Sequence, residues 1–185
     1  MKVKICGLTR LEDIAAVNAC LPDYVGFVFA PSRRQINLEQ ARQLKAALDP
    51  RIQSVGVFAN ADLAEIAQAC EVIDLIQLHG NENDEFVRQV KFLYNLPVIK
   101  LGNSKHADYL LFDGPNPGSG QAFDWNTISC YNKPYFLAGG LALENITQAA
   151  THMPYCLDVS SGVETDGVKD SAKIMQFVSQ VRRLP

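Results

Sequence analysis

The feature that most constrains the fold of this chain is a repeated alternation between short β-rich runs and helical patterns. The runs are rich in Val, Ile, Leu, Phe and Tyr, and most precede a segment in which apolar residues recur every three or four positions. The predicted strands are 3–6, 24–29, 54–58, 74–80, 97–101, 108–113, 135–140 and 155–162. The predicted helices are 11–21, 38–48, 61–71, 84–94, 143–150 and 171–184. Eight strands that mostly alternate with helices predict an α/β fold of the (β/α)8, or TIM, barrel type.

The alternation breaks at one place, between the fifth and sixth predicted strands. The six residues GNSKHA (102–107) are too few for a helix. Fully extended they reach about 20 Å, at ~3.3 Å per residue, which is barely enough to return along a five-residue strand. An antiparallel hairpin would fit locally just as well. A doubly wound open sheet is the main rival to the barrel, but no G-x-G-x-x-G motif follows the first strand.

We therefore expect a single (β/α)8 barrel domain over residues 1–185, with the helix between strands five and six replaced by a short loop. Without that helix, Leu110 and Phe112 on the outer face of the sixth strand would form an apolar patch. We expect neighbouring helices or a second subunit to cover it.

Two predicted helices begin with capping residues. Asn37 directly precedes the second helix and is expected to cap it. Thr9 and Glu12 have the spacing of a capping box at the start of the first helix.

Charge and cysteine content exclude several classes of function. The net charge is −3 and the basic residues are scattered, so no surface for nucleic acid is indicated. No apolar run approaches the ~20 residues of a membrane span, and the N-terminal MKVKICG reads as a strand and not as a signal peptide. The five cysteines are widely spaced, without a Cys-x-x-Cys pair, which supports neither a disulfide framework nor a metal site. We expect a cytoplasmic protein with reduced thiols.

Polar residues gather where the predicted strands end. In a (β/α)8 barrel, the C-terminal ends of the strands face the active site. In chain order, these ends carry Cys6, Arg33, Arg34, Gln77, His79, Asp113, Gly139, Gly140, Asp158, Ser160, Ser161 and Gly162.

Each of these residues also has an ordinary structural explanation. A lone cysteine is usually a small buried apolar residue, but strand alternation places Cys6 on the same face as Lys2 and Lys4, and a polar inner face weakens that explanation. Asp113 could simply form a turn. His79 could be an ordinary strand-end residue, and we assign it no catalytic role.

The glycine pair at 139–140 could likewise be only a tight turn. It becomes more informative together with the Ser-Ser-Gly at 160–162, because many barrels bind phosphate after strands seven and eight.

Seven motifs stand in the order found in one enzyme family. They are KICGLT (4–9), GFVF (26–29), VGVF (55–58), QLHG (77–80), GSGQAFDW (118–125), AGGL (138–141) and DVSSGVE (158–164). Through them the chain resembles phosphoribosylanthranilate isomerase over essentially its full length. The resemblance implies a (β/α)8 barrel and an aldose–ketose isomerase of tryptophan biosynthesis that needs no cofactor. The implied reaction is the Amadori rearrangement of N-(5-phosphoribosyl)anthranilate to 1-(2-carboxyphenylamino)-1-deoxyribulose 5-phosphate.

The resemblance also implies an acid and a base. The reaction opens the ribose ring to an imine and then moves a proton from C2 of the sugar, so that Asp113 would be the acid and Cys6 the base. An unperturbed aspartic acid is only about 0.1% protonated at pH 7, and raising its pKa by three units takes about 4 kcal/mol. A free cysteine is already a few per cent thiolate at that pH.

The remaining implied residues bind the substrate. Arg34 would grip the aromatic carboxylate with two hydrogen bonds, although APSRRQI is one residue shorter than the family pattern and leaves Arg33 as the alternative. Asp158 would touch the sugar hydroxyls. The phosphate would be bound by Gly139, Gly140, Ser161 and Gly162.

Two other functions compete with this one. A phosphoribosyl isomerase of histidine synthesis catalyses the same rearrangement, but that family has an aspartate where this chain has Cys6. A catalytically inactive sugar-phosphate binding module is disfavoured by the presence of both Cys6 and Asp113. The expected partner is a small phosphoribosyl substrate, with the protein itself a monomer or a homodimer.

Overall fold

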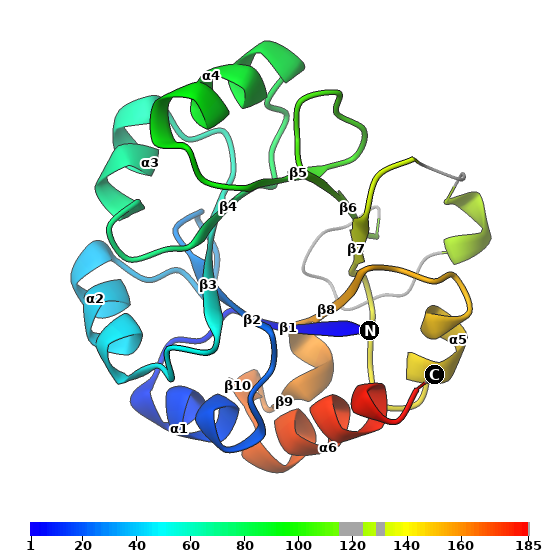
Figure 1. The fold of residues 1–185 in the computed structure, drawn as a ribbon. Helices are drawn as coiled ribbons and strands as arrows, with labels where there is room; N and C mark the ends of the chain where they lie inside the picture. Colours follow the sequence, from blue (N-terminus) through cyan, green and yellow to red (C-terminus); the bar gives the residue numbers. More distant parts are fainter. Residues whose placement is uncertain (115–123, 129–131, 185) are drawn as a thin grey trace.

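The predicted barrel is present in the computed structural model, which describes residues 1–114, 124–128 and 132–184. Figure 1 shows its strands as an inner ring surrounded by helices. The strands are β1 (Lys2–Cys6), β2 (Tyr24–Val28), β3 (Gln53–Phe58), β4 (Leu75–Leu78), β5 (Val98–Leu101), β6 (Tyr109–Phe112), β7 (Tyr135–Leu137) and β8 (Cys156–Val159). The helices are α1 (Leu11–Cys20), α2 (Leu38–Ala47), α3 (Leu63–Ala69), α4 (Asp84–Tyr94), α5 (Ile146–Ala150) and α6 (Ser171–Arg182).

Smaller elements lie between these. The 3-10 helices are η1 (Trp125–Thr127) and η2 (Ser161–Val163), and a short antiparallel ribbon pairs β9 (Glu164–Thr165) with β10 (Val168–Lys169). Most of the GSGQAFDW motif lies outside the described residues.

All eight barrel strands run parallel, and β8 closes the barrel against β1. Strands β5 and β6 are parallel neighbours, with Ile99 opposite Tyr109. The hairpin and the open sheet are therefore excluded for this chain. Because the strands are parallel, all their C-terminal ends meet at one rim of the barrel.

The loop between β5 and β6 stands where a helix would normally cover the barrel (Figure 1). Ser104 donates to Asp84 Oδ1 at 2.5 Å, which ties the loop to the start of α4. Asp108 accepts from Lys91 Nζ of α4 at 2.6 Å and from the Val98 amide of β5 at 2.8 Å. Leu110 is only 1% exposed, so its outward-facing side chain is covered within the chain.

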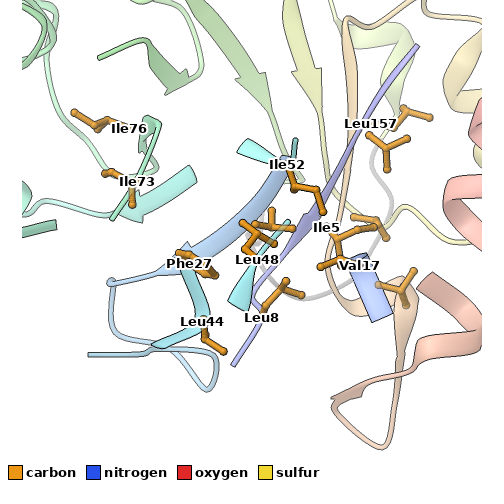
Figure 2. Close-up of a cluster of buried hydrophobic side chains, with 14 of the residues drawn as sticks. Ile5, Leu8, Val17, Phe27, Leu44, Leu48, Ile52, Ile73, Ile76 and Leu157 are labelled. Carbon is orange, nitrogen blue, oxygen red and sulfur yellow. The ribbon is translucent and has the colours of Figure 1, made fainter. Parts of the chain in front are cut away.

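Two apolar clusters build the core. The larger cluster fills the space between the strands and the helices, and Figure 2 shows Ile5 of β1 and Val17 of α1 among its side chains. The smaller cluster lies mainly toward the strand starts and comprises Tyr24, Val55, Leu75, Ile99, Leu111, Phe136, Ala138 and Cys156. Because this end is filled with side chains, the hollow end is the rim where the strands finish.

One of the two predicted helix caps is confirmed. Asn37 caps α2, and its side chain accepts from the Gln40 amide at 2.8 Å. The predicted capping box of Thr9 and Glu12 is wrong. The α1 helix is capped at Arg10, and Asp13 accepts from the Thr9 amide at 2.9 Å and the Arg10 amide at 3.1 Å. Asp13 takes this role because its buried carboxylate also pairs with the Arg10 guanidinium at 2.6 Å.

No helix in residues 1–114, 124–128 or 132–184 is both long and apolar enough to cross a membrane.

Candidate active site

A pocket of about 310 Å³ opens at the rim where the strands end. Among the polar residues that line it are Cys6, Arg34, Gln77, His79, Asp113, Asp158, Ser160 and Ser161, together with Gly139 and Gly140. Seven of the eight residues predicted for the site thus share one pocket. The eighth, Gly162, does not line it, and neither does Arg33.

Two glycines make room for the Cys6 thiol and for Arg34. A Cβ atom at Gly26 would lie 2.5 Å from Cys6 Sγ. Strand β2 therefore needs a residue without a side chain next to the thiol. Gly7 has a φ of +80°, and a Cβ atom there would lie 2.4 Å from Arg34 Cδ. The glycine after the thiol therefore turns the chain at the end of β1 and lets Arg34 lie over the backbone.

The charge state of Cys6 depends on its neighbours. Desolvation raises the pKa of the Cys6 thiol, whereas the Lys4 ammonium opposes that rise. Desolvation therefore works against the thiolate that a base needs, and Lys4 works for it.

A buried ion pair crosses the seam where β8 closes on β1. Lys4 Nζ lies 2.6 Å from Asp158 Oδ2, and the side chains are 0% and 5% exposed. Burial alone would lower the pKa of Lys4, but Asp158 and Cys6 hold it above its ordinary value. Asp158 Oδ1 is buried and has no hydrogen-bond partner among the described residues. Asp158 therefore offers the pocket an unused acceptor.

Asp113 follows β6 and has a polar neighbour at each carboxylate oxygen. His79 Nε2 lies 3.2 Å from Asp113 Oδ2, and the Gly114 amide donates to Oδ1 at 2.7 Å. These two contacts fix the position of the carboxyl group at the rim of the pocket.

The two candidate arginines point to different places. Arg34 lines the pocket, whereas Arg33 is 52% exposed at its side chain and reaches the Gly167 carbonyl. Both arginines bind Glu164, and Arg34 does so through Nε at 2.7 Å and Nη2 at 3.1 Å. Although burial alone would raise the pKa of Glu164, Arg34 and Lys169 lower it to about 2. The geometry favours Arg34 as the pocket's cation, held in place by Glu164.

The loops after β7 and β8 meet closely. Gly139 and Gly140 have positive φ values of 79° and 67°. A Cβ atom at Gly162 would lie 1.9 Å from the Leu141 carbonyl oxygen, so the two loops pack backbone against backbone. Gly162 therefore acts from behind the pocket, by allowing this contact.

The reasoning from sequence missed Lys4 and Glu164 as members of the site. Lys4 was placed on the inner face, but its partner Asp158 lies 154 residues away in the sequence. Glu164 belongs to the DVSSGVE motif, which was the available signal.

Comparisons with known proteins place the chain among isomerases. The family model described as N-(5'phosphoribosyl)anthranilate (PRA) isomerase matches residues 3–180. The N-(5'-phosphoribosyl)anthranilate isomerase of Endomicrobium trichonymphae is 44% identical, and the match covers 99% of each chain.

Solved structures agree with this placement. The phosphoribosyl anthranilate isomerase of Thermus thermophilus superposes with a TM-score of 0.88 at 37% identity, covering 100% of both chains. An isomerase in complex with reduced 1-(o-carboxyphenylamino)-1-deoxyribulose 5-phosphate matches with a TM-score of 0.86 at 34% identity, again over 100% of both chains. A structure of monomers of the dimeric Thermotoga maritima enzyme gives 0.83 at 33% identity, also with 100% coverage of both chains.

Proposed function

The chain belongs to the N-(5'-phosphoribosyl)anthranilate isomerase family, and we propose that Cys6 and Asp113 are the base and the acid of its reaction. The protein is an isomerase of tryptophan biosynthesis, which converts N-(5'-phosphoribosyl)anthranilate to 1-(2-carboxyphenylamino)-1-deoxyribulose 5-phosphate. The observation that carries the proposal is that one pocket holds a thiol from the end of β1 and a carboxyl from the end of β6.

Each residue has one proton to move. Asp113 protonates the ring oxygen of the sugar, so that the ring opens to an imine. The Cys6 thiolate then takes the proton from C2, which gives the enol. The enol becomes the ketone by losing its hydroxyl proton and gaining a proton at C1, and one net proton passes from Cys6 back to Asp113 to restore the starting state. No atom is gained or lost, which is why two well-placed proton carriers suffice.

The reaction needs both groups in a defined state at the same time. Only the arrangement with a proton on Asp113 and a thiolate at Cys6 is reactive. Lys4 lies on the same inner face of β1 as Cys6 and lowers the cost of the thiolate. We assign Lys4 the role of stabilising the reactive arrangement.

Substrate binding is assigned to the rest of the pocket. Arg34 binds the carboxylate of the aromatic ring, and the unused Oδ1 of Asp158 accepts from a sugar hydroxyl. The loops that carry Gly139, Gly140 and Ser161 bind the phosphate, and Gly162 keeps these loops in contact.

Two variants test the acid and the base. Cys6→Ser should lose most of its turnover of phosphoribosylanthranilate while it folds normally, because a hydroxyl is a far weaker base than a thiolate. Asp113→Asn should lose turnover but still bind a product analogue, since the amide keeps the shape and lacks the proton. If the serine variant kept half of the wild-type turnover, the base would be another group. If the asparagine variant lost folding and binding together, Asp113 would be a structural turn residue.

The location and the oligomeric state of the enzyme are also proposals. We propose a cytoplasmic enzyme that acts as a monomer or a homodimer and binds no nucleic acid, consistent with its charge of −3 and scattered basic residues. Sedimentation of the purified chain would give its oligomeric state.

A further inference from the structure

A network of polar contacts runs from β1 to the end of β6 along the wall of the pocket. Lys4 Nζ donates to Gln77 Oε1 at 2.8 Å, and Gln77 Nε2 lies 2.8 Å from His79 Nδ1. His79 Nε2 in turn lies 3.2 Å from Asp113 Oδ2. Lys4 is 0% and Gln77 1% exposed, so the first two members are shielded from water.

Because Lys4 can only donate, it fixes which atom donates and which accepts at each contact of this network. An ammonium group can only donate hydrogen bonds, so the oxygen of the Gln77 amide must face Lys4. The amide nitrogen then faces His79, and it too can only donate. His79 Nδ1 must therefore present its lone pair, which places the proton of the neutral ring on Nε2, toward Asp113.

We propose that Gln77, oriented by Lys4, holds His79 in the Nε2–H tautomer, and that His79 is thereby the positioning residue that keeps the acidic proton of Asp113 available to the substrate. This inference rests on the proposed role of Asp113 as the acid. It assigns functions to Gln77 and His79, for which the sequence alone indicated none.

The tautomer matters because the opposite one would accept the acidic proton of Asp113 and keep it from the substrate. With the proton on Nδ1, the lone pair of His79 Nε2 would face Asp113, and a protonated Asp113 would donate to the ring. With the proton on Nε2, the ring presents an N–H to Oδ2 at 3.2 Å and cannot accept the acidic proton, which is left for the sugar oxygen. In catalytic triads the wrong histidine tautomer costs about 10⁴-fold in kcat, which shows how much one ring proton can decide.

Other charged groups near His79 do not undo this assignment. Asp158 of β8 is paired with Lys4 at 2.6 Å, and this pairing keeps the Lys4 ammonium charged and fixed as a donor. Cys6 of β1 is a thiolate in the proposed reactive state and then has no proton to donate to Nδ1.

The first experiment reads the tautomer directly by ¹⁵N NMR of histidine-labelled protein at about pH 8, above the ordinary titration range of histidine. The chain has 3 histidines, so His79→Gln assigns the signals. We expect Nδ1 of His79 to be unprotonated and Nε2 to carry the proton. In Gln77→Glu the introduced carboxylate can only accept, so Nδ1 should become protonated. A protonated His79 Nδ1 in the wild type would overturn the proposed tautomer, whether or not any variant folds.

The second experiment joins the tautomer to turnover. Gln77→Glu should lower kcat by about tenfold or more while KM changes by less than about twofold, since groups that move protons and not those that bind substrate are affected. Gln176→Glu, the same change on the exposed face of α6, should leave both unchanged. Wild-type kcat in a Gln77→Glu variant with switched Nδ1 would refute the role of the tautomer. Full turnover by Asp113→Asn would instead refute the acid assignment and with it the catalytic half of this inference, while the NMR result would stand separately.

Discussion

Replacing Lys4 with methionine should destabilise the protein strongly, because it leaves the Asp158 carboxylate buried without its partner. Lys4 and Asp158 are 2.6 Å apart, with side chains 0% and 5% exposed. Removing one member of a buried pair typically costs about 3–5 kcal/mol. We expect a loss of that size in the free energy of unfolding, measured by urea denaturation at about pH 8.

The destabilisation caused by Lys4→Met should also depend on pH. Without Lys4, burial raises the folded-state pKa of Asp158 above its unfolded value of ~3.9. A group with a raised folded-state pKa contributes most stability below the unfolded pKa, and that contribution is lost as the pH rises through the folded pKa. The destabilisation by Lys4→Met should therefore be smaller at about pH 5 than at about pH 8.

A matched control is present on the surface. Lys45 and Asp74 are also 2.6 Å apart, but their side chains are 31% and 39% exposed. Lys45→Met should cost at most about 1 kcal/mol, because solvent screens the pair. The reasoning is refuted if Lys4→Met costs no more than Lys45→Met at about pH 8, or if its cost grows toward pH 5.

Four further substitutions test other features. Gly26→Ala should fold but lose about 10²-fold in turnover, since the new methyl group displaces the Cys6 thiol; unchanged turnover would show that the thiol has room to move. Arg34→Lys should raise KM more than it lowers kcat, because the bidentate grip is lost, whereas Arg33→Lys should change neither; the reverse pattern would exchange their roles. Ser104→Ala should cost about 1 kcal/mol in thermal unfolding by releasing the β5–β6 loop from α4, with turnover as the control measurement that stays constant.

The barrel could be predicted from the sequence because its strands are short, β-rich and mostly separated by amphipathic helices. Helix ends were predicted less well. The predicted helix 61–71 is observed as Leu63–Ala69, because the Asp62 side chain accepts from the Glu65 amide and starts the helix there. At α1, Asp13 displaced the expected Glu12, since a buried carboxylate with a guanidinium partner is held more firmly than an exposed one.

The pocket was predictable to the extent that position along a strand decides which way a residue faces. Cys6 and Asp113 follow from the rule that strand ends meet at one rim. The pairing of Lys4 with Asp158 does not, because it depends on which strands become neighbours when the barrel closes. The hold of Glu164 on Arg34 depends likewise on the path of a loop that has no periodic pattern.

The closure of β8 on β1 brings together site residues from the two ends of the chain. Lys4 pairs with Tyr24 across β1 and β2, a separation of 20 residues, but with Asp158 across a separation of 154. The larger loop costs about 2 kcal/mol more in chain entropy, from a cost that grows as 1.5RT ln n. On loop entropy alone, the seam is expected to be the last strand pairing to form. An opening of β8 that left the other seven strands paired would remove the counterion of Lys4 and the loop of Ser161 together, and the enzyme would lose activity while most of the barrel stayed folded.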